Sequence, residues 1–172
     1  TIQDATTKAV TVNGGTLVMR DTLGNGAAGK LTMTAGNATV GSVNGATQFG
    51  NTLGTTITVT GAGNAANGFV GAVTTLGDGA TGGDIIFNGN ARAQAGVGAN
   101  GNALNSITIN NATVQFDAAV FATTLTVANG NGVADLRHNF NGATVFTANG
   151  QVTLDGGKTI TGAITSTSGG VT

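Results

Sequence analysis

The side chains that could do chemistry in this chain of 172 residues are few and scattered. His138 is the single histidine, and it follows Asp135 by three residues, a spacing that could form half of a catalytic or metal-binding pair. One histidine among scattered aspartates nevertheless makes a poor zinc site. Cysteine is absent, and no nucleophile-elbow sequence surrounds any of the four serines, Ser42, Ser106, Ser166 and Ser168. We therefore predict that His138 is a structural or solvated loop residue and that the chain is not an enzyme.

A second candidate site is the glycine-rich segment at residues 79–86, Gly-Ala-Thr-Gly-Gly-Asp-Ile-Ile. It differs at Ala80 from the calcium-binding nonapeptide of solenoid proteins, whose metal ligands come from successive repeats. Because the segment occurs once, an ordinary glycine turn is the favoured interpretation. Asp78 and Asp84 are the best candidates for calcium ligands, and no other cofactor is expected.

The element that recurs along the chain is a short strand followed by a turn. In each of six copies two apolar residues flank a threonine, and glycine or asparagine follows, as in Thr56-Ile57-Thr58-Val59-Thr60-Gly61. Apolar residues two apart lie on one face of a strand, and β-branched residues suit that setting. The apolar pairs predicted to face inward are Val10 and Val12, Leu31 and Met33, Ile57 and Val59, Ile107 and Ile109, Leu125 and Val127, and Val152 and Leu154.

The spacing of these copies indicates the fold. Val152 follows Val10 by 142 residues over six intervals, counting a looser copy at residues 84–89, so the mean spacing is about 24 residues. A strand-and-turn unit at this spacing is typical of a solenoid, in which neighbouring coils stack about 4.8 Å apart. We predict an all-β parallel β-helix (β-solenoid), right-handed and three-sided, with about seven coils in a single domain, residues 1–172. Residues 88–106 contain no apolar pair and are expected to leave the coil as a loop.

The alternative fold is a β-sandwich, which also contains many short strands. Its hairpins would space the strands by about 8–12 residues, so the observed spacing favours the solenoid.

The threonines between the apolar pairs should face outward. In-register stacking would place them in one file, interrupted by Ile86 of the looser copy. A regular threonine array can order water, which would suit ice binding, but the next outward positions are irregular. A threonine ladder that stabilises the sheet is the favoured interpretation. The file comprises Thr11, Thr32, Thr58, Thr108, Thr126 and Thr153.

Composition argues against several classes of function. The net charge is −1 with only six Lys and Arg residues, so the clustered basic surface of a nucleic-acid-binding protein is lacking. No window is apolar enough to span a bilayer, and membrane insertion of this segment is not expected. Glycine contributes 31 residues and proline none, while hydrophobic residues make up 40% of the chain and recur in regular pairs. This pattern favours an ordered β structure over disorder.

The segment Asn13-Gly14-Gly15-Thr16-Leu17 and the recurring apolar-Thr-apolar-Asn/Asp-Gly units resemble the strand repeats of bacterial autotransporter passenger domains. The composition rich in Ala, Gly, Asn and Thr is similar to that of the large rickettsial surface antigens of the outer membrane protein B type. The resemblance covers most of the chain at the level of repeats and composition. It implies a secreted rod at the bacterial cell surface with an adhesive, protective or spacer role, and it implies no functional residues.

The sequence thus favours a non-enzymatic extracellular rod of a bacterial cell surface, which would present its loops to a host-cell or cell-surface ligand. The alternative is a self-assembling subunit of an extracellular filament or surface layer. An ice-binding or polysaccharide-processing β-helix ranks third, because the outward positions beside the threonine file are irregular and the basic residues are scattered. Neither terminus carries a capping helix, a proline or a charged cluster. We therefore expect the solenoid ends to meet further coils of the same polypeptide or another copy of the chain.

Overall fold

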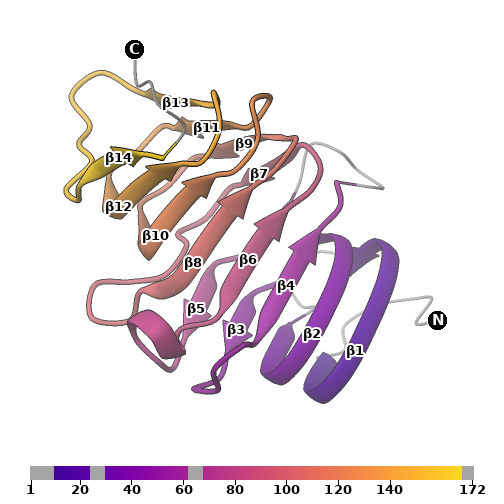
Figure 1. Cartoon of the computed structure of the whole chain (residues 1–172). Coiled ribbons are helices and arrows are strands. Elements are labelled where there is room, and N and C mark those ends of the chain that lie inside the picture. The colour runs from indigo at the N-terminus through magenta and orange to yellow at the C-terminus, as the bar shows by residue number, and fades with distance from the viewer. Residues whose placement is uncertain (1–9, 24–29, 62–67, 168–172) are drawn as a thin grey trace.

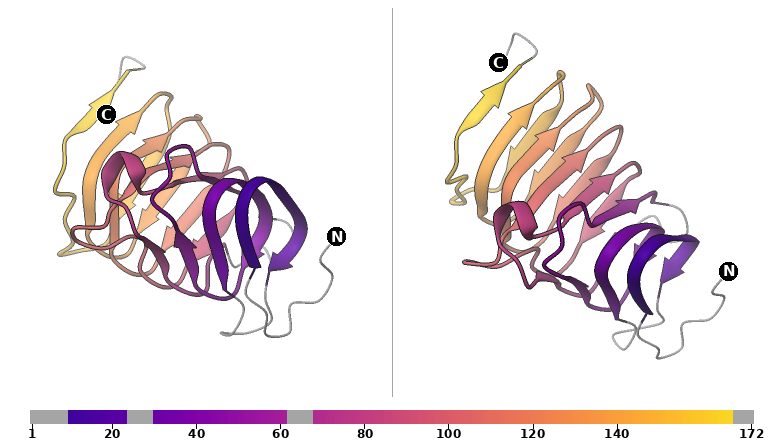
Figure 2. Two further views of the ribbon diagram at one scale, coloured as in Figure 1. Left: turned by 90° about the horizontal axis from the view of Figure 1, so that it is seen from below. Right: turned by 60° about the horizontal axis from the view of Figure 1, so that its bottom comes forward.

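The computed structural model describes residues 10–23, 30–61 and 68–167, which form a parallel β-solenoid of about seven coils (Figure 1). Every pair of named strands is parallel, and the antiparallel bridge between Ala99 and Asn102 closes a turn. The solenoid prediction is therefore confirmed, and the β-sandwich alternative is wrong. Figure 2 shows the strands of successive coils lying side by side along the rod.

Each coil has three sides, here called A, B and C in chain order. The first two strands are long and bend around all three sides: β1 (Val10–Leu23) and β2 (Leu31–Val43). Side A continues with β3 (Thr47–Phe49) and β5 (Val73–Thr75), and then with single bridging residues and the first residues of β10 and β12. The remainder of side B consists of β4 (Thr56–Val59), β6 (Asp84–Phe87), β8 (Leu104–Ile109), most of β10 (Val120–Val127) and of β12 (Phe140–Phe146), and β14 (Ile164–Ser166).

Side C is a separate four-stranded sheet in its later coils. Its strands are β7 (Ala91–Ala93), β9 (Thr113–Phe116), β11 (Val133–Leu136) and β13 (Gln151–Leu154). A single turn of 3₁₀ helix, η1 (Gly79–Thr81), precedes β6 at a corner.

Inward side chains of successive coils stack in continuous columns, because parallel pairing sets equivalent residues opposite one another. These columns form a core that runs the length of the rod. One column on side A contains Val10, Leu31, Thr47, Val73, Val97, Val120, Phe140 and Ile160. One column on side B contains Leu17, Ala38, Ile57, Ile85, Ile107, Leu125, Thr144 and Ile164.

Most of the predicted inward residues are buried, but their copies do not share one side. The copies of Val10 and Leu31 lie on side A, those of Ile57, Ile107 and Leu125 on side B, and that of Val152 on side C. Val10 and Val152 are half-buried, and Leu154 is 39% exposed because no described strand follows β13 on side C. The spacing between paired residues of adjacent coils also varies, from 16 residues between Leu31 and Thr47 to 28 residues between Ile57 and Ile85.

The expectation that residues 88–106 leave the coil is wrong for much of that segment. Ala91 and Ala93 form β7, and Val97 bridges side A. Ala93 is fully buried and pairs with Phe69 in one neighbouring coil and Phe116 in the next, so a methyl group fills the space between two aromatic residues. Phe87 stacks edge-to-face against each of these rings, with ring centroids 6.1 Å apart. Small residues can therefore serve as core residues here.

Close coil stacking also requires glycine at particular corners. Gly142 has φ +149°, and a Cβ added there would lie 1.7 Å from the carbonyl oxygen of Ala122 in the preceding coil. A side chain at this position would push adjacent coils apart.

We predict that Ile107→Ala lowers the free energy of unfolding by about 2–5 kcal/mol, because Ile107 is fully buried between Ile85 and Leu125 and its truncation leaves a cavity. Ile164→Ala, at a side chain 53% exposed, serves as the control and should cost below about 1 kcal/mol. Urea unfolding measures both values. Equal losses would contradict the assignment of Ile107 to the core.

We further predict that Gly142→Ala destabilises the protein by more than about 1 kcal/mol, since it combines a disfavoured φ with a backbone clash. Gly130→Ala is the matched control, because a Cβ at Gly130 meets no atom within 4 Å. Thermal unfolding of the two variants should show a lower midpoint for Gly142→Ala alone. An unchanged midpoint would show that adjacent coils can move apart at this corner at little cost in free energy.

Candidate functional site

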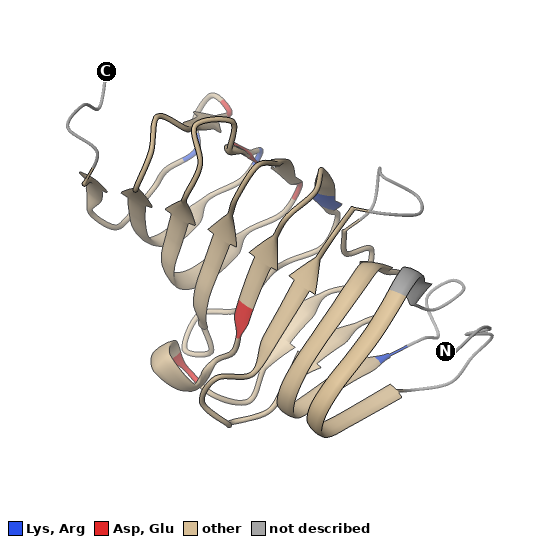
Figure 3. Cartoon of the chain, turned by 45° about the vertical axis from the view of Figure 1, so that its right-hand side comes forward, with Lys and Arg blue, Asp and Glu red and all other residues tan. Residues whose placement is uncertain are grey.

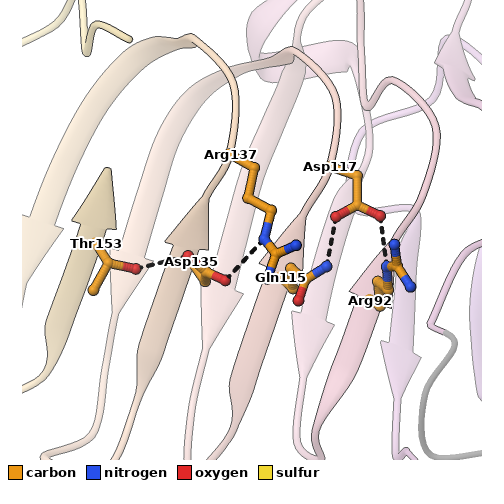
Figure 4. Close-up of polar contacts among 6 residues, drawn as sticks. All are labelled: Arg92, Gln115, Asp117, Asp135, Arg137 and Thr153. Atoms are coloured by element: carbon orange, nitrogen blue, oxygen red, sulfur yellow. Dashed lines mark hydrogen bonds and ion pairs between the residues drawn. The ribbon is translucent and has the colours of Figure 1, made fainter. Parts of the chain in front are cut away.

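Charged residues occupy only a few places on the rod (Figure 3). A cluster of charged and polar side chains is therefore distinct from the rest of the surface. The outer face of side C carries such a group, here called the outer polar row and drawn in Figure 4: Arg92, Gln115, Asp117, Asp135, Arg137 and Thr153. Four of its members occupy paired outward positions on consecutive strands: Arg92, Gln115, Asp135 and Thr153. The row therefore results from the register of side C.

Within the outer polar row each carboxylate is bound by neighbouring donors. The guanidinium Nε of Arg92 lies 2.5 Å from Oδ2 of Asp117, and Nε2 of Gln115 donates to the other oxygen. Asp135 accepts from the hydroxyl of Thr153 at 2.9 Å and from Nε of Arg137 at 3.3 Å. The two arginine side chains are 45% and 48% exposed, so each ion pair contributes below about 1 kcal/mol. The arrangement links coils, and each oxygen of the two carboxylates accepts a hydrogen bond.

His138 does not join Asp135 in a catalytic pair. The carboxylate of Asp135 is bound by Thr153 and Arg137, whereas Nδ1 of His138 accepts from the backbone N–H of Asn139 at 2.9 Å. His138 is exposed in the turn between β11 and β12, in agreement with the loop assignment.

The calcium candidates Asp78 and Asp84 act as hydrogen-bond acceptors. Oδ1 of Asp78 caps η1 by accepting from the N–H of Gly79 at 2.9 Å, and it also accepts from the N–H of Ala103 at 2.8 Å. Oδ1 of Asp84, on the outer face of side B, accepts from Asn105 Nδ2 and Ser106 Oγ. Each carboxylate thus joins one coil to the next. Among the described residues no three His, Cys, Asp or Glu side chains form a group that could hold a metal ion.

The six threonines predicted to form one file are divided among the three sides. Thr11 pairs with Thr32 on side A, Thr153 lies in the outer polar row, and Thr58, Thr108 and Thr126 share a file on side B. The single-file expectation fails because the copies themselves lie on different sides. The side B file reads Thr39, Thr58, Ile86, Thr108, Thr126, Val145 and Thr165, so no more than two threonines are consecutive.

A second set of threonines, which was not predicted from the sequence, links adjacent coils by hydrogen bonds. The hydroxyl of each donates to a backbone carbonyl of the preceding coil, at 3.0 Å from Thr34 to Val12 and 3.2 Å from Thr60 to Val40. Thr74, Thr161 and Thr167 make the same type of contact. Thr34 and Thr60 each come directly after an apolar-Thr-apolar unit, and this position was the available sequence signal for those two.

The C-terminal end of the rod contains a depression with a volume of about 410 Å³, here called the end depression. Its lining mixes polar groups with apolar side chains, and the apolar side chains include exposed or half-buried ends of the core columns. Thr144 is fully buried in the lining, and its hydroxyl has no hydrogen-bond partner. The lining residues are Thr144, Phe146, Ala148, Asn149, Gly150, Gln151, Val152, Leu154, Ile160 and Ile164.

Comparison of the chain with protein-family models, with curated proteins and with solved structures finds no match. The structure itself defines the class of fold, which is a parallel β-solenoid of about seven coils. Within the part of the chain that the structure describes, no helix is long and apolar enough to cross a membrane.

We predict that calcium leaves the stability of the protein unchanged, because N–H and O–H donors already bind Asp78 and Asp84. Asp84→Ala should cost about 1–2 kcal/mol with or without calcium, since Asn105 and Ser106 lose their charged acceptor. Urea unfolding with added calcium and with a chelator measures both effects. A calcium-dependent rise in stability that Asp84→Ala removes would instead establish a metal site.

Proposed function

We propose that this chain is part of a non-enzymatic structural rod at a bacterial cell surface, similar in role to an autotransporter passenger domain. The observation that carries this proposal is the continuity of the core. Inward columns pass through every described coil, so the fold extends along one axis and can separate its two ends in space. An elongated spacer has to hold its two ends apart. It does not require reactive side chains that meet at one site.

The distribution of polar groups supports the same role. The carboxylates of Asp78, Asp84, Asp117 and Asp135 all accept hydrogen bonds that stabilise turns or link coils. Corners between strands differ in length from coil to coil and include the η1 turn and the turn closed by Ala99 and Asn102. Such loops on a rigid scaffold are where a host-cell or cell-surface ligand would bind.

A subunit of an extracellular filament or surface layer is the second candidate function, and the end depression favours it. Leu154 and Ile164, two apolar residues of the depression, are 39% and 53% exposed. Stacking of further coils on this end would bury them.

Electron tomography of the producing cells, with a gold-labelled antibody raised against residues 1–172, tests the proposal. We expect label on isolated projecting stalks, whereas a regular labelled polymer would favour the filament and label confined to the cell interior would contradict both. A polysaccharide depolymerisation assay with the purified protein is the companion experiment. Release of oligosaccharides would overturn the non-enzymatic assignment.

A further inference from the structure

Asn-Gly dipeptides recur along the rod and carry a latent chemistry of their own. The backbone nitrogen of the glycine can attack the side-chain amide carbon of the asparagine, because a residue without a Cβ leaves the approach open. The reaction needs a mobile asparagine side chain and a glycine N–H that is not held in a hydrogen bond. In the described part of the chain the asparagines of complete Asn-Gly pairs are Asn13, Asn44, Asn88, Asn100, Asn129, Asn131, Asn141 and Asn149.

Contacts between coils restrain two of these pairs strongly. Oδ1 of Asn88 accepts from Nδ2 of Asn110 at 2.6 Å, and Oδ1 of Asn141 accepts from the hydroxyl of Thr161 at 3.2 Å. The glycine after each asparagine packs against a backbone carbonyl of the preceding coil. Neither the side chain nor the backbone can therefore move into the geometry of attack without separating adjacent coils.

Four further pairs are restrained at one of the two reacting groups. Oδ1 of Asn13 accepts from the hydroxyl of Thr34, and Gly45 is buried. The N–H groups of Gly132 and Gly150 donate to backbone carbonyls, each at 2.8 Å. Each of these contacts has to break before the ring can close.

Asn100-Gly101 lacks such restraints. The pair forms the tip of a two-residue turn that two backbone hydrogen bonds between Ala99 and Asn102 close, each at 3.0 Å. Both tip residues are exposed, and a Cβ at Gly101 would meet no atom within 4 Å. Among the described residues no hydrogen bond holds the Asn100 side chain or the N–H of Gly101. Opening of so small and exposed a turn leaves the coils in place.

Asn129-Gly130 is the pair most like it. Gly130 is also exposed and has no atom within 4 Å of its would-be Cβ. Here, however, Oδ1 of Asn129 accepts from the N–H of Asn131 at 3.2 Å, and its backbone carbonyl accepts from Gly132 at 2.8 Å. This asparagine is fixed at both ends, which makes it a matched comparison for Asn100.

We propose that Asn100 is a site of spontaneous deamidation in the folded protein, with water as the co-reactant. A base in the solvent removes the N–H proton of Gly101, and the nitrogen forms a bond to Cγ of Asn100. The bond from Cγ to the side-chain nitrogen breaks, and that nitrogen takes up a proton and leaves as ammonia. One water then opens the five-membered imide at either carbonyl, which yields aspartate or isoaspartate. The inference does not rest on a cell-surface role.

The product changes a corner of the rod that has little charge. Deamidation adds one carboxylate to a chain whose net charge is −1. The nearby Asp78 already accepts from the N–H of Ala103 at 2.8 Å, so two carboxylates would share this corner. The isoaspartate product also lengthens the backbone by one methylene between Val97 and β8.

The experiment incubates residues 1–172 at mildly alkaline pH and follows each Asn-Gly pair by proteolysis and mass spectrometry. We expect Asn100 to react at least tenfold faster than Asn88 and Asn141, and at least threefold faster than Asn129. Labelling with an isoaspartyl methyltransferase should mark the same peptide. In urea the rates should converge to within threefold, because unfolding removes the restraints from every pair.

Two variants complete the test. Asn100→Gln should abolish the acidic species that ion-exchange chromatography separates, since ring closure from the longer side chain is slower. Asn102→Gln, at an exposed asparagine of the same turn that alanine follows, should leave that species unchanged. Reaction of Asn100 no faster than Asn88 and Asn141 in the folded protein, or an equal lead of Asn100 in urea, would overturn the proposal.

Discussion

The parallel backbone ladder between coils is the interaction on which the rest of this structure depends. It fixes the separation of adjacent coils and places each residue beside its equivalent in the next coil, so side chains stack in columns without any need for shared sequence. The same ladder accounts for the glycine at position 142, where the carbonyl oxygen of Ala122 occupies the place of a side chain. Packing and backbone geometry thus have one common origin.

This ladder also explains how a surface with few charges holds together. Because outward residues lie beside one another, a short polar side chain can reach the next coil, as Asp84 reaches Ser106 and Thr153 reaches Asp135. Threonine is suited to this task, since its hydroxyl reaches a neighbouring carbonyl while its β-branched form favours the strand. Long charged side chains join coils in only a few of the described contacts, such as those of Arg92 with Asp117 and of Lys30 with Gln48.

The inward faces could be predicted from the sequence because alternation with a period of two is a local property, and Ile57, Ile107 and Leu125 are buried as it indicated. The side on which each strand lies could not be predicted, because an apolar-Thr-apolar unit looks alike on all three sides. Small core residues were also missed: Ala93 contributes to the core only because Phe69 and Phe116 flank it. The end depression depends on contacts between coils, which no local pattern reveals.

The ends of such a rod follow different energetics from its middle. In a solenoid each coil is stabilised by its intrinsic energy and by its interfaces with two neighbours, so an end coil lacks one interface. Leu154 and Ile164 show this deficit as exposed apolar surface, whereas Ile107, with a coil on each side, is fully buried.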